Sequence, residues 1–386
     1  MSSKHSSRIG TLDIARGLAA LAVCAGHLRA AIFVDFGQLE STSLLQKFFY
    51  AMTSLGHEAV MIFFVLSGYL VGGSVLKQKH KFEWLKYSIT RLTRLWVILI
   101  PALLLTLIVD QTLQFFQPEV FAGANIEMWA SGPDKSNYSS SIDTLIGNIF
   151  FQQTIFVPVY GTNSPLWSLS NEFYYYFIFP SLLLLIGYLG QRNNFGLRLF
   201  YGFGGVIALS LLPSSFATGF LVFCMGALVS WFNGQETRDK GLGSYQILIG
   251  CAAFIFALYL SKANVTLRFV NHEILIGLGF SLFLVSLAKV RLRFILLRRS
   301  AAFLADISYS LYLTHFPVVL LIAATCYGTN QVKPDVIGLS QFIGWLGVVL
   351  LIAVFFWWLF ERHTDSIRNK VMVFFARRKG CAGGNE

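Results

Sequence analysis

Residues 11–30 read TLDIARGLAALAVCAGHLRA, an almost continuous apolar run that nevertheless contains Asp13, Arg16 and His27. A run of this length is what an α-helix needs to cross the hydrocarbon core of a membrane. A charged side chain in hydrocarbon costs free energy, so ionisable residues inside such a run are candidates for function. The segment therefore predicts a membrane-spanning helix that carries chemistry.

The rest of the chain has the same apolar character. Of its 386 residues, 55% are hydrophobic and 13% are charged, whereas an average soluble domain has roughly 25% charged residues. This composition excludes a disordered chain, a disulfide scaffold and a cytosolic globular enzyme. The net charge of +11 does not indicate a nucleic-acid partner, because no basic stripe stands apart from the apolar runs.

Apolar runs near the length of a membrane span recur from end to end. The sequence therefore predicts an all-α fold, a polytopic transmembrane helical bundle of about ten spans embedded in membrane lipid. The expected spans are residues 10–33, 53–76, 89–116, 166–189, 197–212, 215–232, 244–260, 272–288, 303–327 and 337–360.

The distribution of Lys and Arg orients these spans, because cytoplasmic segments carry the excess of positive charge. With both termini inside, 23 basic residues fall on inner segments and five on outer ones. The termini are therefore expected to be cytoplasmic, and the long loop 117–142 to lie outside. The expected organisation is a transmembrane domain at 1–361 and a basic cytoplasmic tail at 362–386, in a bacterial inner membrane.

Arg16 and His27 are expected on one face of the first span. They are 11 residues apart, which is about three helical turns and about 16 Å along the axis. Asp13 is three residues before Arg16 and can pair with it, so Arg16 is either a charge partner at the membrane entrance or a functional group. His27 is either a hydrogen-bonding group between helices or a general base, because imidazole titrates near working pH.

Other polar residues collect at two predicted depths. Arg91 and Arg94 open the third span at the inner level, where they either anchor the helix or bind phosphate through their guanidinium forks. The outer level of the predicted bundle holds a second group, at the starts of the second and fourth spans. Its members are His57, Glu58, Trp167, Ser170 and Glu172.

Five segments, in order, resemble the acyltransferase-3 family of integral-membrane O-acyltransferases. The segments are LDIARGLAALAVCAGH, FFVLSGYLVG, the pair Arg91 and Arg94, LWSLSNEFYYYFIFP and ISYSLYLTHFP. They supply residues that match the motifs of that family: Asp13, Arg16, His27, Phe64, Ser67, Gly68, Trp167, Ser168, Glu172, Tyr175, Ser308, Tyr309, Tyr312 and His315.

The resemblance implies transfer of an acyl group, usually acetyl, from cytoplasmic acyl-coenzyme A to a hydroxyl of an extracytoplasmic carbohydrate such as O-antigen or exopolysaccharide. His27 would be the general base or a transient acyl carrier, and Glu172 would orient His27 or a substrate hydroxyl. Arg16, Arg91 and Arg94 would bind the donor phosphates, and no metal is expected. Supporting roles are expected for Asp13, Ser67, Trp167, Ser170, His57, Glu58, Tyr309 and His315.

Two further expectations concern the reaction. Some family members carry a soluble domain after the last span, whereas here the chain ends 26 residues after Phe360, so transfer is expected to be direct or to need a separate partner. The rival class is a proton-coupled transporter or flippase that uses the same intramembrane polar residues. The absence of a visible internal repeat favours the enzyme.

Overall fold

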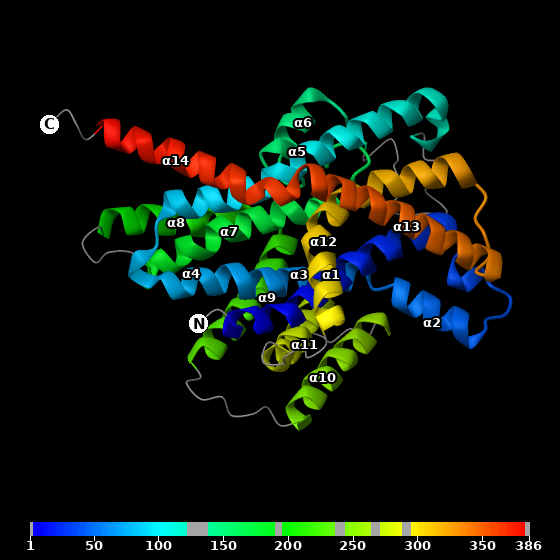
Figure 1. Cartoon of the computed structure of the whole chain (residues 1–386), viewed down its shortest axis with the longest axis horizontal. Coiled ribbons are helices and arrows are strands. Elements are labelled where there is room, and N and C mark those ends of the chain that lie inside the picture. Colours follow the sequence, from blue (N-terminus) through cyan, green and yellow to red (C-terminus); the bar gives the residue numbers. More distant parts are fainter. Residues whose placement is uncertain are drawn as a thin grey trace. The chain divides into compact units, whose positions relative to one another are not determined.

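The computed structural model describes residues 3–121, 138–189, 195–235, 244–263, 271–287 and 295–382 (Figure 1). Within these ranges the regular structure is helical. The described residues form isolated β-bridges but no β-strand. Residues 1–26, 41–81 and 167–308 form one compact unit, here called unit 1. Residues 27–40, 82–166 and 309–386 form unit 2.

Each of the ten predicted spans coincides with helical structure. The bounds are α1 Ser3–Ile32; α3 Gly56–Ser67 continued by η2 Gly68–Gly72 and α4 Gly73–Gln78; α5 Trp84–Phe116; α7 Trp167–Leu185; α8 Phe195–Leu211; α9 Ser214–Gln235; α10 Ser244–Lys262; α11 His272–Leu287; α12 Ile295–Ile322 continued by η6 Ala323–Tyr327; and α13 Val336–Leu359.

Seven candidate membrane spans in the described part of the chain are long and apolar enough to cross a bilayer. The protein is therefore an integral, multi-pass membrane protein. α8 and α11 contain shorter apolar stretches, at Arg198–Leu211 and His272–Leu287. The full count of ten spans and the orientation of the termini stay predictions, and most of the loop 117–142 lies outside the described residues.

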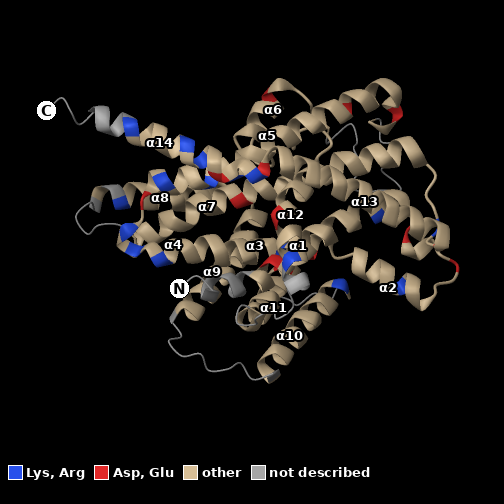
Figure 2. Ribbon diagram, viewed as in Figure 1, with Lys and Arg blue, Asp and Glu red and all other residues tan. Residues whose placement is uncertain are grey.

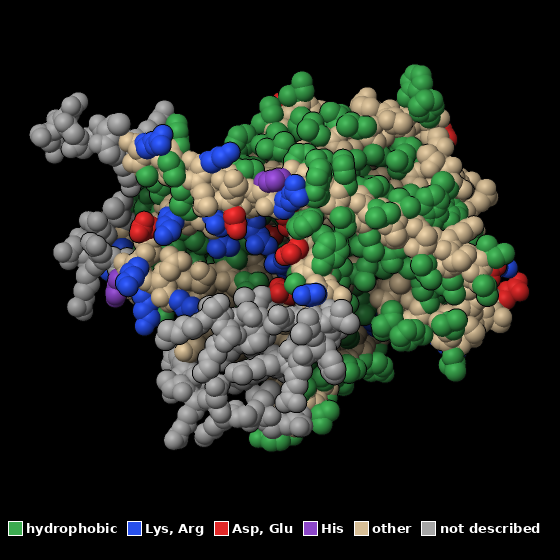
Figure 3. Space-filling view, viewed as in Figure 1, with side chains coloured by type: hydrophobic (Ala, Val, Ile, Leu, Met, Phe, Trp, Pro, Cys, Tyr) green, Lys and Arg blue, Asp and Glu red, His purple; other side chains and the backbone are tan. Residues whose placement is uncertain are grey.

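The outward side chains of α13 are those of a helix in lipid. Val336, Ile343 and Leu351 are 85%, 70% and 70% exposed, and the helix contains no charged residue. Figure 3 shows hydrophobic side chains over much of the visible surface. In Figure 2, by contrast, Lys and Arg recur along α14 (Thr364–Ala382). That helix lies within the predicted basic tail.

Two short helices were not predicted, because each is too short to cross a membrane and therefore does not form a long apolar run. α2 (Leu44–Thr53) begins with a capping box between Ser43 and Gln46, and α6 (Ile142–Ile149) begins at Ser141, whose side chain accepts from the Thr144 amide. Such caps satisfy amide groups that the first turn leaves without partners. Both helices therefore have local start signals that hydrophobicity alone does not reveal.

The packing of unit 1 depends on glycine where η2 meets α9. A Cβ at Gly68 would lie 1.8 Å from the Phe223 carbonyl oxygen, and one at Gly226 would lie 1.9 Å from the Val65 carbonyl oxygen. Glycine at both positions lets the two backbones touch, as small residues do between membrane helices.

Candidate functional site

His27 and His315 form a hydrogen-bonded pair within unit 2. The Nδ1 atom of His27, on α1, lies 2.9 Å from Nε2 of His315, on α12. Their rings are nearly parallel, with an interplanar angle of 19°, and Phe316 packs edge-on against His27. His315 is fully buried, whereas His27 is partly exposed. One histidine of the pair is thus accessible and the other is enclosed.

The contacts of His315 determine where the protons lie in the neutral pair. Its Nδ1 faces the carbonyl oxygens of Leu311 at 3.0 Å and Tyr312 at 2.8 Å. Carbonyl oxygens only accept hydrogen bonds, so Nδ1 of His315 carries the hydrogen. Nε2 of neutral His315 must then accept, and Nδ1–H of His27 donates to it. This leaves a lone pair on Nε2 of His27.

This arrangement suits His27 to accept a proton. In serine hydrolases, a buried group holds the histidine base through its Nδ1–H and leaves Nε2 to react. Here a neutral His315 occupies the place that a carboxylate takes in those enzymes. The sequence singled out both histidines, but it did not predict their contact.

A buried polar loop that sequence analysis missed lies in the same unit as the histidine pair. Asp110 of α5 accepts hydrogen bonds from Thr162, and Asn163 donates to Thr106 and to the Leu313 carbonyl of α12. All of these side chains are buried. Only Asp110 carried a signal in the sequence, a carboxylate in the middle of an apolar run.

Glu172 belongs to a separate cluster, in unit 1. Ser67 Oγ lies 3.1 Å from Glu172 Oε1 and 3.1 Å from the Tyr176 hydroxyl, which donates to the same carboxylate oxygen. The structure thus joins two of the motif segments. The tyrosine in this cluster is Tyr176, four residues after Glu172 on α7 and hence on the same face. The motif residue Tyr175 instead donates to the Phe216 carbonyl.

Arg16 is anchored to α12 within unit 1. Its Nε donates to Ser308 Oγ at 3.1 Å, and its Nη2 donates to the Ala305 carbonyl at 2.6 Å. Asp13 lies close enough to Arg16 for a Coulombic interaction, and a direct ion pair between them stays a prediction. The contact between Arg16 and Ser308 joins the first motif to the last.

His57 and Glu58 of unit 1 each form an ion pair. His57 Nε2 lies 3.1 Å from Glu273 Oε1, and its ring stacks against Trp167. Buried Glu58 lies 2.8 Å from Lys262 Nζ and accepts from Ser261. Sequence analysis did not predict Glu273 or Lys262 as partners, because they stand more than 200 residues away along the chain.

The remaining predicted residues have separate surroundings. Arg91 is half-buried, with its guanidinium 5.6 Å from the centre of the Tyr87 ring, and Arg94 is exposed. The Tyr309 hydroxyl donates to the Leu95 carbonyl at 3.1 Å. Ser170 is fully buried on α7.

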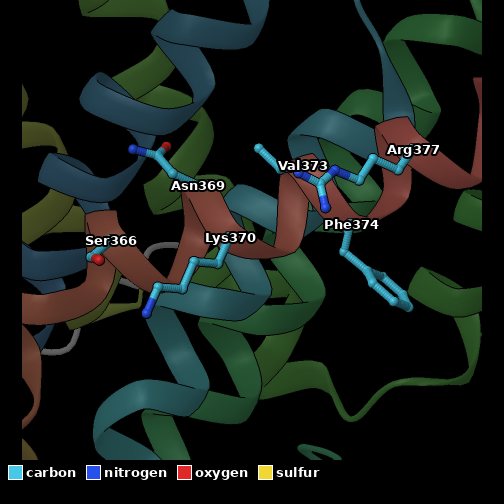
Figure 4. Close-up of a pocket in the computed structure, with 6 residues that line it drawn as sticks. All are labelled: Ser366, Asn369, Lys370, Val373, Phe374 and Arg377. Carbon is cyan, nitrogen blue, oxygen red and sulfur yellow. The ribbon is translucent and has the colours of Figure 1, made fainter.

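α14 carries a groove on one face, with a volume of about 440 Å³ (Figure 4). Its lining includes two cations, Lys370 and Arg377, and two apolar residues, Val373 and Phe374. These residues are exposed, and α14 packs against α5 within unit 2. The groove is basic and amphipathic, which is typical of a helix at a membrane surface.

Comparison with known proteins identifies the class of this chain. A family model described as an acyltransferase domain matches residues 9–362. The peptidoglycan O-acetyltransferase OatA of Listeria monocytogenes is 28% identical over 258 residues, which cover 64% of this chain and 34% of that protein. The O-acetyltransferase OatA of Staphylococcus aureus is 25% identical over 310 residues, covering 69% of this chain and 46% of that protein.

The match covers only part of these relatives. The chain thus aligns with between a third and a half of their length. No solved structure matches this chain.

Proposed function

Because the chain belongs to the acyltransferase-3 family, we propose that it is a membrane-bound O-acetyltransferase that modifies a hydroxyl of an extracytoplasmic carbohydrate. The observation that carries this proposal is the histidine pair, in which His27 donates from Nδ1 and is left with a lone pair on Nε2. A hydroxyl becomes a strong nucleophile when a positioned base removes its proton as it attacks.

In the proposed reaction His27 accepts a proton from the acceptor and later donates it to the leaving group. Nε2 takes the hydroxyl proton while the oxygen attacks the thioester carbonyl of acetyl-coenzyme A. The carbon–sulfur bond then breaks, and the thiolate leaves with the proton that His27 accepted. The products are an O-acetyl ester and free coenzyme A. His315 would stabilise the intermediate imidazolium through the Nδ1–H of His27.

The alternative within this function is covalent. Nε2 of His27 would attack the thioester first, and the acetyl-imidazole would then pass its acetyl group to the acceptor hydroxyl. Both routes need an unprotonated Nε2 on His27.

The donor is proposed to enter from the cytoplasm of a bacterial cell. This proposal rests on ten spans with both termini inside, as the distribution of basic residues predicts. Arg91 and Arg94 would bind the donor phosphates. Arg16 belongs to the same proposed set, and its guanidinium already donates to Ser308 and Ala305. We also propose that residues 1–361 form the transferase domain and that residues 362–386 form a cytoplasmic tail.

The acceptor is proposed to be a polysaccharide of the cell envelope. O-antigen and exopolysaccharide fit this class, and the name of the Listeria relative adds peptidoglycan to it. Glu172, Ser67 and Tyr176 would orient an acceptor hydroxyl, since a carboxylate with two hydroxyl partners is a suitable hydrogen-bonding group for sugars.

The test uses purified protein in lipid vesicles with acetyl-coenzyme A labelled in its acetyl group. Envelope carbohydrates are supplied on the other side of the vesicle membrane from acetyl-coenzyme A. The measured quantity is the label that becomes attached to the carbohydrate and is released by base, as an ester would be. Transfer supports the proposal. Proton or carbohydrate movement across the vesicle with no ester formed in any acceptor would instead identify a transporter.

The orientation is tested separately by cysteine labelling from outside whole cells. Cys381 is kept as the only cysteine in one variant, and a cysteine in loop 117–142 is the only one in another. Labelling of the loop alone is expected. Labelling of Cys381 alone would overturn the predicted orientation.

A further inference from the structure

Pro317 leaves one backbone group of α12 without its helical partner. Proline has no N–H, and its ring clashes with the carbonyl four residues earlier, which here belongs to Leu313. In a membrane-spanning helix no bulk water replaces the missing donor. His315 lies between Leu313 and Pro317 in the sequence. The orientation of its ring therefore depends on the hydrogen bonds that fix this turn of α12.

Asn163 supplies the missing donor. Its Nδ2 lies 2.9 Å from the Leu313 carbonyl oxygen and 3.1 Å from Thr106 Oγ1. The side chain is fully buried, and its own Oδ1 has no hydrogen-bond partner among the described residues. What this amide contributes is therefore its NH2 group, which donates to the carbonyl oxygen four residues before Pro317.

Asp110 in turn holds the segment that carries Asn163. Thr162 donates to both carboxylate oxygens of Asp110, from its amide at 2.9 Å and from its hydroxyl at 2.6 Å. Gly161 has a φ of +59°, and a Cβ there would lie 2.2 Å from Asp110 Oδ2. Only glycine allows the chain to approach the carboxylate so closely.

We propose that Asp110, Thr162 and Asn163 are positioning residues for the reaction, which hold the turn of α12 before Pro317 so that Nε2 of His315 meets Nδ1 of His27. This inference rests on the proposed function for its effect on acetyl transfer. It adds three residues that lie outside the five motif segments, Asp110, Thr162 and Asn163, and connects them through the Leu313 carbonyl to the segment that carries His315. A misplacement of about 1 Å at a reacting group can cost about a hundredfold in rate.

The decisive variant is Asn163→Asp, which keeps the shape but replaces the donor with an oxygen that faces the Leu313 carbonyl. The matched control is Asn148→Asp, another fully buried asparagine of unit 2, whose hydrogen bonds run to Thr144, Pro158 and Tyr160. We expect Asn163→Asp to lower kcat about tenfold to a hundredfold at unchanged donor KM. The control should lose less than about threefold when the two proteins have equal thermal stability.

Two substitutions of Asp110 test whether its contacts with Thr162 matter for the rate. Asp110→Asn keeps both contacts, because its amide can donate to the Thr162 hydroxyl while its oxygen accepts from the Thr162 amide. We expect this variant to retain at least about half of the parental kcat. Asp110→Leu, which has the same size and neither contact, should resemble Asn163→Asp. Equal losses in the Asn and Leu variants would contradict the proposal.

A readout that does not depend on acetyl transfer separates this inference from the proposed function. Nitrogen-15 spectra of the histidine rings report which nitrogen carries hydrogen. The parent and Asn148→Asp should show His27 with hydrogen on Nδ1, and Asn163→Asp should show a mixture of both tautomers. An unchanged His27 tautomer in Asn163→Asp overturns the inference, whether or not the parent transfers acetyl groups.

Discussion

His27 and His57 are the same residue type in opposite surroundings. His27 lies in unit 2, donates from Nδ1 to another histidine and is left with a lone pair on Nε2. His57 lies in unit 1, is 54% exposed, and already uses Nε2 against the Glu273 carboxylate. A base needs a free nitrogen, an orienting partner and partial shelter from water, and His27 alone of the two meets all three conditions. The partners of each histidine, more than its residue type, therefore make His27 the candidate for the base.

The largest expected effect is that of His27→Ala. General-base assistance contributes about a hundredfold to ten-thousandfold, and a covalent role would contribute more. The variant should bind the donor and lose acetyl transfer by at least this factor. Donor binding and acetyl-ester formation by the purified protein are the measurements. Retention of more than a tenth of parental activity would remove His27 from the chemistry.

The next effect is that of His315→Phe, which fills the same space without an acceptor for the Nδ1–H of His27. A misplacement of about 1 Å at a reacting group can cost about a hundredfold in rate, so we expect a loss of about tenfold to a hundredfold. His315→Gln should recover part of this loss, because its amide oxygen can accept from His27. The measurement is kcat for the two variants at equal thermal stability. Equal activity of both with the parent would show that the pair has no role in the reaction.

A smaller effect is expected for Ser67→Ala in unit 1. The hydroxyl of Ser67 is a hydrogen-bonding partner of Glu172 and Tyr176, and one such contact in a membrane protein contributes about 0.6 kcal/mol. Transfer should therefore fall by less than about tenfold. A drop in the rate of acetyl-ester formation to that of His27→Ala would make Ser67 a nucleophile. Unit 1 would then also contain a reacting group.

The smallest effect is expected for His57→Gln. An exposed ion pair is worth about 1 kcal/mol or less, and the Gln amide can still donate to Glu273. Acetyl transfer should stay within about twofold of the parent. The rate is measured at saturating acceptor and again at low acceptor concentration. A large loss at both would give His57 a part in the chemistry.

The fold was largely predictable from local sequence, whereas the contacts of the site were not. The spans at 53–76 and 272–288 coincide with helical structure because each is a local run of apolar residues. The pairing of His27 with His315 joins residues 288 positions apart, and no local pattern encodes it. The spacing of Glu172 and Tyr176, by contrast, is local, and it places both side chains on one face of a helix. The motif residue Tyr175 instead donates to a backbone carbonyl of α9.

The loop from Gly161 to Asn163 shows a second limit. Its residues are ordinary turn formers, and their importance comes from Pro317, a proline more than 150 positions later whose missing N–H leaves the Leu313 carbonyl in need of a donor. Only the folded chain brings that carbonyl and the Asn163 amide together.

The most direct test of the central claim compares acetyl transfer by purified His27→Gln and His57→Gln. The two substitutions are chemically identical, and glutamine can replace a histidine hydrogen bond but cannot accept a proton. With both proteins at parental thermal stability and parental donor binding, His27→Gln should lose at least about a hundredfold in rate. His57→Gln should retain at least half of it. Near-parental acetyl transfer by His27→Gln would contradict the role of His27 as the reactive base.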